Sequence, residues 1–116
     1  MKLLHVTIQT DKFDEELEFY EKTAGLQVIR DMRSMGREMV FLADADGDTE
    51  IEIIGNPNAV SAGNQHLSIG FQAENLQALY DALTAAGMDV SPMVKPTPHV
   101  RFFFVKDPAG VSVQFM

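Results

Sequence analysis

The most constraining feature of the sequence is an internal repeat, in which the second half of the chain follows the pattern of the first. A histidine lies in an alternating, strand-like run near the start of each half, at His5 and at His66, 61 positions apart. An amphipathic segment follows each run and ends at a glycine, Gly25 or Gly87, 62 positions apart. A glycine just past a helix supplies the left-handed conformation that ends it. Two copies of one pattern predict two copies of one structural unit.

Both amphipathic segments are predicted to be helices. The first has an apolar face formed by Phe13, Leu17, Tyr20 and Ala24. The second has a matching face formed by Leu76, Leu79, Tyr80 and Leu83. Thr10 or Asp11 can cap the first helix, because a side-chain oxygen can accept a hydrogen bond from a free N–H group of the first turn.

Three further short strands close each half, because alternating segments there are separated by turn residues. They are expected at about residues 26–32, 37–43 and 49–54, and again at about 88–91, 100–106 and 111–116. Asp46-Gly47 and Asp107-Pro108-Ala109-Gly110 are typical turn sequences. The predicted fold class is therefore α+β: a tandem of two βαβββ modules with curved mixed sheets, which pack into a single domain over residues 1–116. Module one covers about 1–56, module two about 64–116, and the linker about 57–63.

Composition and charge exclude several classes of function. The chain has no cysteine, which rules out disulfides and thiolate chemistry. Lys and Arg number 9 against 17 Asp and Glu, and the net charge of -8 argues against nucleic acid or an anionic membrane as a partner. No apolar run is long enough for a signal peptide or a membrane span, so a cytoplasmic protein is expected.

Residues that can bind a metal occupy equivalent places in the two halves. Alternation puts Glu50 and Glu52 on one face of the strand that ends the first half, and Gln114 stands at the place of Glu52 in the second. Facing concave sheets would bring together His5, Glu52, His66 and Gln114. Two imidazoles and a carboxylate suit Zn, Ni, Fe(II), Mn or Co, with the amide oxygen as a weaker ligand. A histidine on a strand is more often structural, so a core role is the alternative.

Two residues near the last hairpin are candidates for substrate contact. His99 lies in a proline-flanked loop that leads into a strand, and Arg101 follows it. His99 is expected either at a pocket edge or in a structural role. Arg101 can bind a substrate carboxylate or pair with a surface acid.

The chain resembles the vicinal oxygen chelate superfamily, and most closely its bacterial glyoxalase I (lactoylglutathione lyase) branch. The resemblance covers almost the whole chain and is carried by Leu4-His5-Val6, Phe19-Tyr20 with Gly25-Leu26, Ile51-Glu52-Ile53, Gln65-His66-Leu67-Ser68-Ile69 and Asp107-Pro108-Ala109-Gly110. It implies paired βαβββ modules around a divalent metal, Zn or Ni before Fe, Mn or Co, a small-molecule substrate and a homodimer.

The resemblance also implies roles for individual residues. The metal ligands would be His5, Glu52, His66 and the residue at position 114. Glyoxalase I has Glu at that last position, as ligand and catalytic base, whereas this chain has Gln114. An amide cannot shuttle a proton as a carboxylate does, so Glu52 is the candidate catalytic residue. Asn56 matches a glutathione contact, but two expected arginines are replaced by Gln9 and Ala62, so the resemblance does not extend to glutathione dependence.

Three functions are compatible with these residues. The first is a lyase or isomerase of the glyoxalase I type, in which a divalent ion chelates a small α-hydroxycarbonyl substrate. The second is a metal-free small-molecule binding protein like the bleomycin-resistance proteins, for which the acidic charge suits a cationic drug. The third is a non-heme Fe(II) dioxygenase, because two histidines and a carboxylate form a facial triad. The metal-binding residues favour an enzyme.

Overall fold

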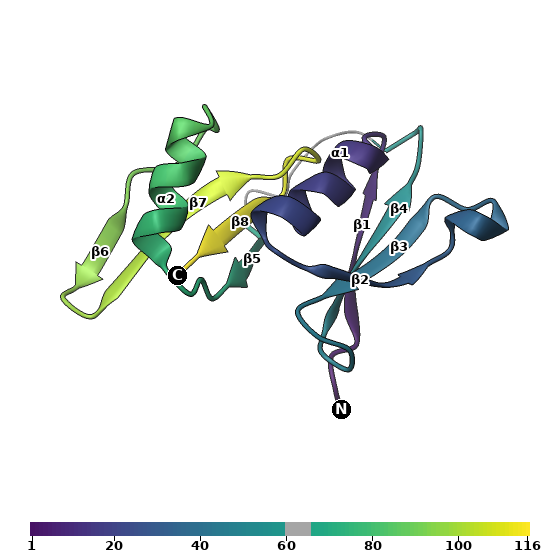
Figure 1. Cartoon of the computed structure of the whole chain (residues 1–116), viewed down its shortest axis with the longest axis horizontal. Helices are drawn as coiled ribbons and strands as arrows, with labels where there is room; N and C mark the ends of the chain where they lie inside the picture. Colours follow the sequence, from purple (N-terminus) through teal and green to yellow (C-terminus); the bar gives the residue numbers. More distant parts are fainter. Residues whose placement is uncertain (60–65) are drawn as a thin grey trace. The chain divides into compact units, whose positions relative to one another are not determined.

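A computed structural model describes residues 1–59 and 66–116 of the chain. These residues form two compact units, Met1–Ser61 and Ala62–Met116. Each unit has one four-stranded sheet and one main helix (Figure 1), so the predicted α+β class with two βαβββ modules is confirmed. The predicted linker at residues 57–63 lies partly outside the described residues. The packing of the two modules into one domain stays a prediction.

The first unit contains a mixed sheet. Its strands are β1 (His5–Thr10), β2 (Gln27–Asp31), β3 (Met39–Ala43) and β4 (Glu50–Gly55). They lie in the order β1-β4-β3-β2, with β1 and β4 parallel and the other pairs antiparallel. The first strand of the unit therefore pairs with its last strand, which places residues about 45 positions apart side by side.

A helix covers the apolar face of this sheet. Helix α1 (Phe13–Glu18) continues into a π-helical turn, η1 (Phe19–Thr23), and the chain then turns at Gly25, whose φ is 70°. Phe13, Leu17 and Tyr20 are buried, as the helical pattern predicts. The predicted cap at Thr10 or Asp11 is wrong, because Lys12 occupies the N-cap position. The Thr10 hydroxyl instead accepts a hydrogen bond from the Lys12 N–H at 3.0 Å, before the first turn.

The second unit repeats this topology. Its elements are β5 (Ser68–Phe71), α2 (Leu76–Ala85), β6 (Val94–Thr97), β7 (Val100–Lys106) and β8 (Ser112–Phe115). The strands lie in the order β5-β8-β7-β6, again with the first and last parallel. The core is formed by Phe103 and Val105 of β7, Val113 and Phe115 of β8, and Leu83 of α2.

One strand of the second unit differs from the prediction. The sequence pattern predicts it at 88–91, but β6 is Val94–Thr97, and Val90 makes only an isolated bridge to Val105. Ser91 interrupts the ladder, because its hydroxyl oxygen accepts the Phe104 N–H at 2.8 Å where a strand would offer a carbonyl. Pro92 then has no N–H to donate, so regular pairing begins further along the chain.

No helix in the described ranges, 1–59 and 66–116, combines the length and the apolar character needed to cross a membrane.

Candidate functional site

The sheet of the first unit carries a polar row on the face opposite Ile51 and Ile53. In the β1–β4 pair His5 lies beside Glu50 and Thr7 lies beside Glu52, whereas Ile51 and Ile53 point to the core. Side chains at paired positions of neighbouring strands share one face of a sheet. His5 and Glu52, two of the predicted metal ligands, are therefore diagonal neighbours on that face.

The carboxylate of Glu52 is held in place by a hydroxyl group. Thr7 Oγ1 donates a hydrogen bond to Glu52 Oε1 at 2.7 Å, and the Glu52 side chain is half-buried. No other residue in the described part of the chain bonds to this carboxylate, so Oε2 keeps its lone pairs for a ligand. A carboxylate that is oriented by a neighbouring donor is typical of metal and catalytic sites.

The second carboxylate of the row has a different partner. Arg30 Nη2 contacts both oxygens of Glu50, at 3.2 and 3.1 Å, and the guanidinium lies 3.9 Å from the centre of the Phe41 ring. Phe41 is buried and also meets the His5 ring edge to face, with the ring centres 6.1 Å apart. Because Arg30 neutralises Glu50, Glu52 is the better candidate for a ligand or base.

Asn56 stands at the end of the same row, just past β4. Its Nδ2 donates to Gln9 Oε1 at 2.8 Å, and its Oδ1 accepts the Asn58 N–H at 2.9 Å. Gln9, which lies on β1, is thus a polar neighbour of Asn56. Both ends of the Asn56 amide are engaged within this unit, so a ligand would have to share or displace one of these hydrogen bonds.

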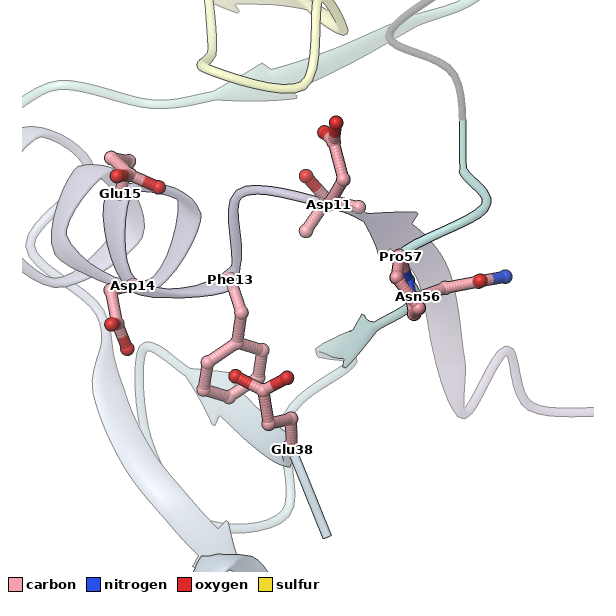
Figure 2. A pocket seen from close by; sticks show the side chains of 8 residues that line it. Asp11, Phe13, Asp14, Glu15, Glu38, Asn56 and Pro57 are labelled. Carbon is pink, nitrogen blue, oxygen red and sulfur yellow. The ribbon is translucent and has the colours of Figure 1, made fainter.

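A hollow of about 310 Å³ lies at the start of α1 (Figure 2). Its lining includes Phe13 and four acidic residues, Asp11, Asp14, Glu15 and Glu38, and contains no basic residue. Asn56 borders it, but in Figure 2 its amide extends away from Glu38. The acidic lining would repel an anionic substrate, and the hollow is distinct from the row that carries His5 and Glu52.

In the second unit, Gln114 lies on the face of the sheet opposite the buried side chains. It pairs with Gly70 of β5 and Phe104 of β7. A methyl group added at Gly70 would lie 3.9 Å from Gln114 Oε1, so the amide oxygen sits over the bare glycine backbone. No hydrogen bond joins this amide to another residue in the described segments. His66 is exposed and precedes β5 by two positions.

The two halves do not repeat the same strand register. In the first unit Glu52 pairs with the residue two positions after His5, and in the second Gln114 pairs with the residue four positions after His66. The spacings in the sequence, 61 positions between the histidines and 62 between Glu52 and Gln114, differ by only one and so do not predict this two-residue difference. Glu52 and Gln114 therefore lie at different positions along the strand direction, relative to the histidine of their own unit.

The two predicted substrate contacts lie apart from this row. His99 is exposed in the turn between β6 and β7. Arg101 is exposed on β7 and shares a face with the buried Phe103, opposite the face of Phe104 and Gln114. Neither residue is a neighbour of Gln114 in its own sheet.

The predicted ligands are divided between the units, His5 and Glu52 in one, His66 and Gln114 in the other. Among the described residues of either unit, no group of three or more His, Asp or Glu side chains could hold a metal ion. The donor types nevertheless fit a divalent ion, because two imidazoles, one oriented carboxylate and one amide oxygen are ligands that such ions accept.

The comparisons with known proteins agree with this architecture. Residues 2–115 match the Glyoxalase/Bleomycin resistance protein/Dioxygenase superfamily. Lactoylglutathione lyase of Haemophilus influenzae is 24% identical over 124 residues, which cover 100% of this chain and 92% of the enzyme.

Solved structures show the same fold at low identity. The trypanothione-dependent glyoxalase I of Leishmania major has a TM-score of 0.80 at 20% identity, covering 100% of this chain and 86% of that one. The fosfomycin resistance protein of Listeria monocytogenes has a TM-score of 0.77 at 15% identity, covering 99% and 91%. With the family match spanning almost every residue, the chain belongs to the Glyoxalase/Bleomycin resistance protein/Dioxygenase superfamily.

Proposed function

We propose that this chain is a metal-dependent lyase or isomerase of the glyoxalase I type that acts on a small α-hydroxycarbonyl compound. The observation that supports it most is the Thr7–Glu52 pair beside His5. A carboxylate fixed at 2.7 Å by a hydroxyl and left open at its other oxygen is suited to bind a cation or accept a proton. The similarity to lactoylglutathione lyase supports the same reaction class.

His5, Glu52, His66 and Gln114 would hold the ion. A divalent ion in such a site supplies Lewis-acid polarisation of a substrate carbonyl. Glu52 accepts the proton from the carbon next to that carbonyl, and Thr7 keeps the carboxylate in one orientation during the transfer. Arg30 keeps Glu50 out of the reaction by pairing with both of its oxygens.

Gln114 sets this chain apart from glyoxalase I. Its amide offers an oxygen as a ligand but cannot take up a proton at neutral pH. All proton transfer in the proposed mechanism therefore falls to Glu52. The strand β8 carries no carboxylate that could act in place of Glu52. The substrate must therefore present its acidic C–H to the first unit.

Metal binding is the first test. Purified protein is titrated with Zn²⁺ and Ni²⁺ against a chelating indicator, alongside the variants His5→Ala, His66→Ala and Glu52→Gln. We expect micromolar or tighter binding by the wild type and a loss of at least tenfold in each variant. His99→Ala is the matched control, since this histidine is exposed in a turn and is not a proposed ligand.

The outcome separates the candidate functions. Wild-type protein that takes up no divalent ion would contradict the enzyme proposal and favour a metal-free binding protein. If metal binds, Gln114→Glu is assayed with methylglyoxal, with and without glutathione. A gain of activity in this variant would support Gln114 as the residue that limits proton transfer, and equal activity would contradict it.

The proposal includes a homodimer, as the family resemblance implies. Sedimentation velocity at several protein concentrations tests this part independently of metal binding, because a persistent monomer would exclude a dimer.

A further inference from the structure

A second hollow of about 310 Å³ lies on the second unit, along β7 and the segment that precedes β6. Its lining includes Phe104, Lys106 and Ser112 of the sheet, together with Ser91 and Pro92. The strand register explains this arrangement, because Phe104 pairs with Gln114 and Lys106 pairs with Ser112. All four of these side chains therefore share one face of the sheet.

Lys106 is the cation of this hollow. Its ammonium makes no hydrogen bond and no ion pair with any residue in the described ranges. Ser112 is half-buried opposite it on β8, and its hydroxyl likewise has no hydrogen-bond partner there. The Ser91 hydroxyl is already engaged, since it accepts the Phe104 N–H at 2.8 Å and donates to the Pro92 carbonyl at 3.1 Å. The ammonium and the Ser112 hydroxyl are thus the donors left for a ligand.

We propose that this hollow binds a carboxylate group of the substrate, with Lys106 as its counter-ion and Phe104 against its carbon chain. The proposal rests on the proposed function, in which Gln114 is one of the ligands of the ion that would bind the reacting carbonyl. Gln114 and Ser112 are two positions apart on β8, a distance of about 7 Å. A carboxylate about six bonds from the reacting carbonyl would span that separation in an extended chain. The substrate class becomes a small α-hydroxycarbonyl compound that carries a carboxylate.

The charge of the hollow favours a singly charged group. Asp89 also lines it, and its exposed carboxylate is the only acidic side chain among the described lining residues. One ammonium beside one carboxylate leaves little positive potential for a dianion such as a phosphate monoester. A singly charged carboxylate bound to Lys106 is repelled less strongly by Asp89 than a dianion is.

The test uses NMR titration of the metal-free full chain, so that it does not depend on the metal. ¹⁵N-labelled protein is titrated with butyrate and, separately, with its neutral isostere butyramide at matched ionic strength. We expect saturable amide shifts around Ser91, Phe104, Lys106 and Ser112 with butyrate, and much weaker ones with butyramide. Lys106→Gln should weaken butyrate binding about threefold to fivefold, the range of an exposed charge pair.

Matched variants distinguish the effect of the Lys106 charge on butyrate binding from the effect of the protein's overall charge. Lys95→Gln removes an exposed lysine of β6 that does not line the hollow, and it should bind butyrate as the wild type does. Lys106→Arg should retain binding, and Asp89→Asn should strengthen it.

Shifts scattered over the surface, or equal butyrate binding by the wild type and Lys106→Gln, would overturn the proposal even if the chain binds metal. Localised butyrate binding that is weakened by Lys106→Gln would support the proposed carboxylate site. If the chain then binds no metal, only the proposed function fails. A phosphate titration run in parallel overturns the preference for a carboxylate if phosphate binds more tightly.

Discussion

The hydroxyl of Thr7 offers the sharpest test of the proposed metal site. Thr7→Val keeps the size and the β-branched shape of the side chain on β1 but removes the hydrogen bond to Glu52 Oε1. Since Val suits a strand as well as Thr does, the fold should be unaffected. The change isolates one interaction, the orientation of the carboxylate.

The expected magnitude follows from the geometry. At 2.7 Å the hydrogen bond is short and is made to a charged group. Such bonds contribute about 1.5–3 kcal/mol, and the half-buried position of Glu52 points to the lower end. Loss of a residue that orients a metal ligand typically weakens metal binding about 10- to 100-fold. We therefore expect Zn²⁺ affinity to fall about tenfold, equivalent to about 1.4 kcal/mol.

The assay is competition with a chelating indicator at neutral pH, with circular dichroism as a check on folding. Thr84→Val is the control, because it removes a hydroxyl that bonds only the Tyr80 carbonyl in α2, at 2.8 Å. Thr7→Ser restores the donor and should restore affinity. If Thr7→Val binds Zn²⁺ as tightly as the wild type while His5→Ala does not, the idea that Thr7 orients Glu52 for the metal is refuted.

Three further predictions concern the fold and its charges. Phe103→Ala should lower the free energy of unfolding by about 3–5 kcal/mol in urea titrations, because the ring is fully buried; a loss below 1 kcal/mol would contradict its place in the core. Gly55→Ala should cost about 1–3 kcal/mol in the same measurement, since the new Cβ would lie 2.7 Å from Glu38 Cβ; unchanged stability would mean that this close approach relaxes freely. Hydrogen bonds from Arg33 lower the pKa of Asp31 from 3.8 to about 2, so Arg33→Gln should raise it toward 3.8 in an NMR titration. A lowered pKa means that any stabilisation from this pair is complete above pH 3.8 and is lost as the pH falls toward 2, and an unchanged pKa in the variant would contradict the pairing.

The sequence repeat predicts the two βαβββ units because each half contains its own complete set of local signals. The buried helix face of the first unit, with Phe13, Leu17 and Tyr20, follows from spacing alone. The turns at Gly25 and Gly87 follow from the conformational demand of a helix end, and both glycines have positive φ. These features depend on residues that are close together in the chain.

The features that the sequence does not predict depend on pairing between distant segments. The two-residue difference in register between Glu52 and Gln114 has no local signal, because it is set by how β1 and β5 align on their partners. The displacement of β6 comes from the Ser91 hydroxyl meeting Phe104, which lies 13 positions away. The pairing of Arg30 with Glu50 likewise joins β2 to β4 across the sheet.

The parallel pairing of first and last strands has a consequence for how the protein is made. All strands of the first sheet lie before residue 56, and all strands of the second lie after residue 66. During synthesis, β1 must wait for β4 to leave the ribosome, about 45 residues later, before it gains its only partner in the first sheet. Once β4 has emerged, the first sheet has every strand it needs while the second half is still being translated. Folding can thus proceed in two successive stages, with few opportunities for strands of one half to be captured by the other.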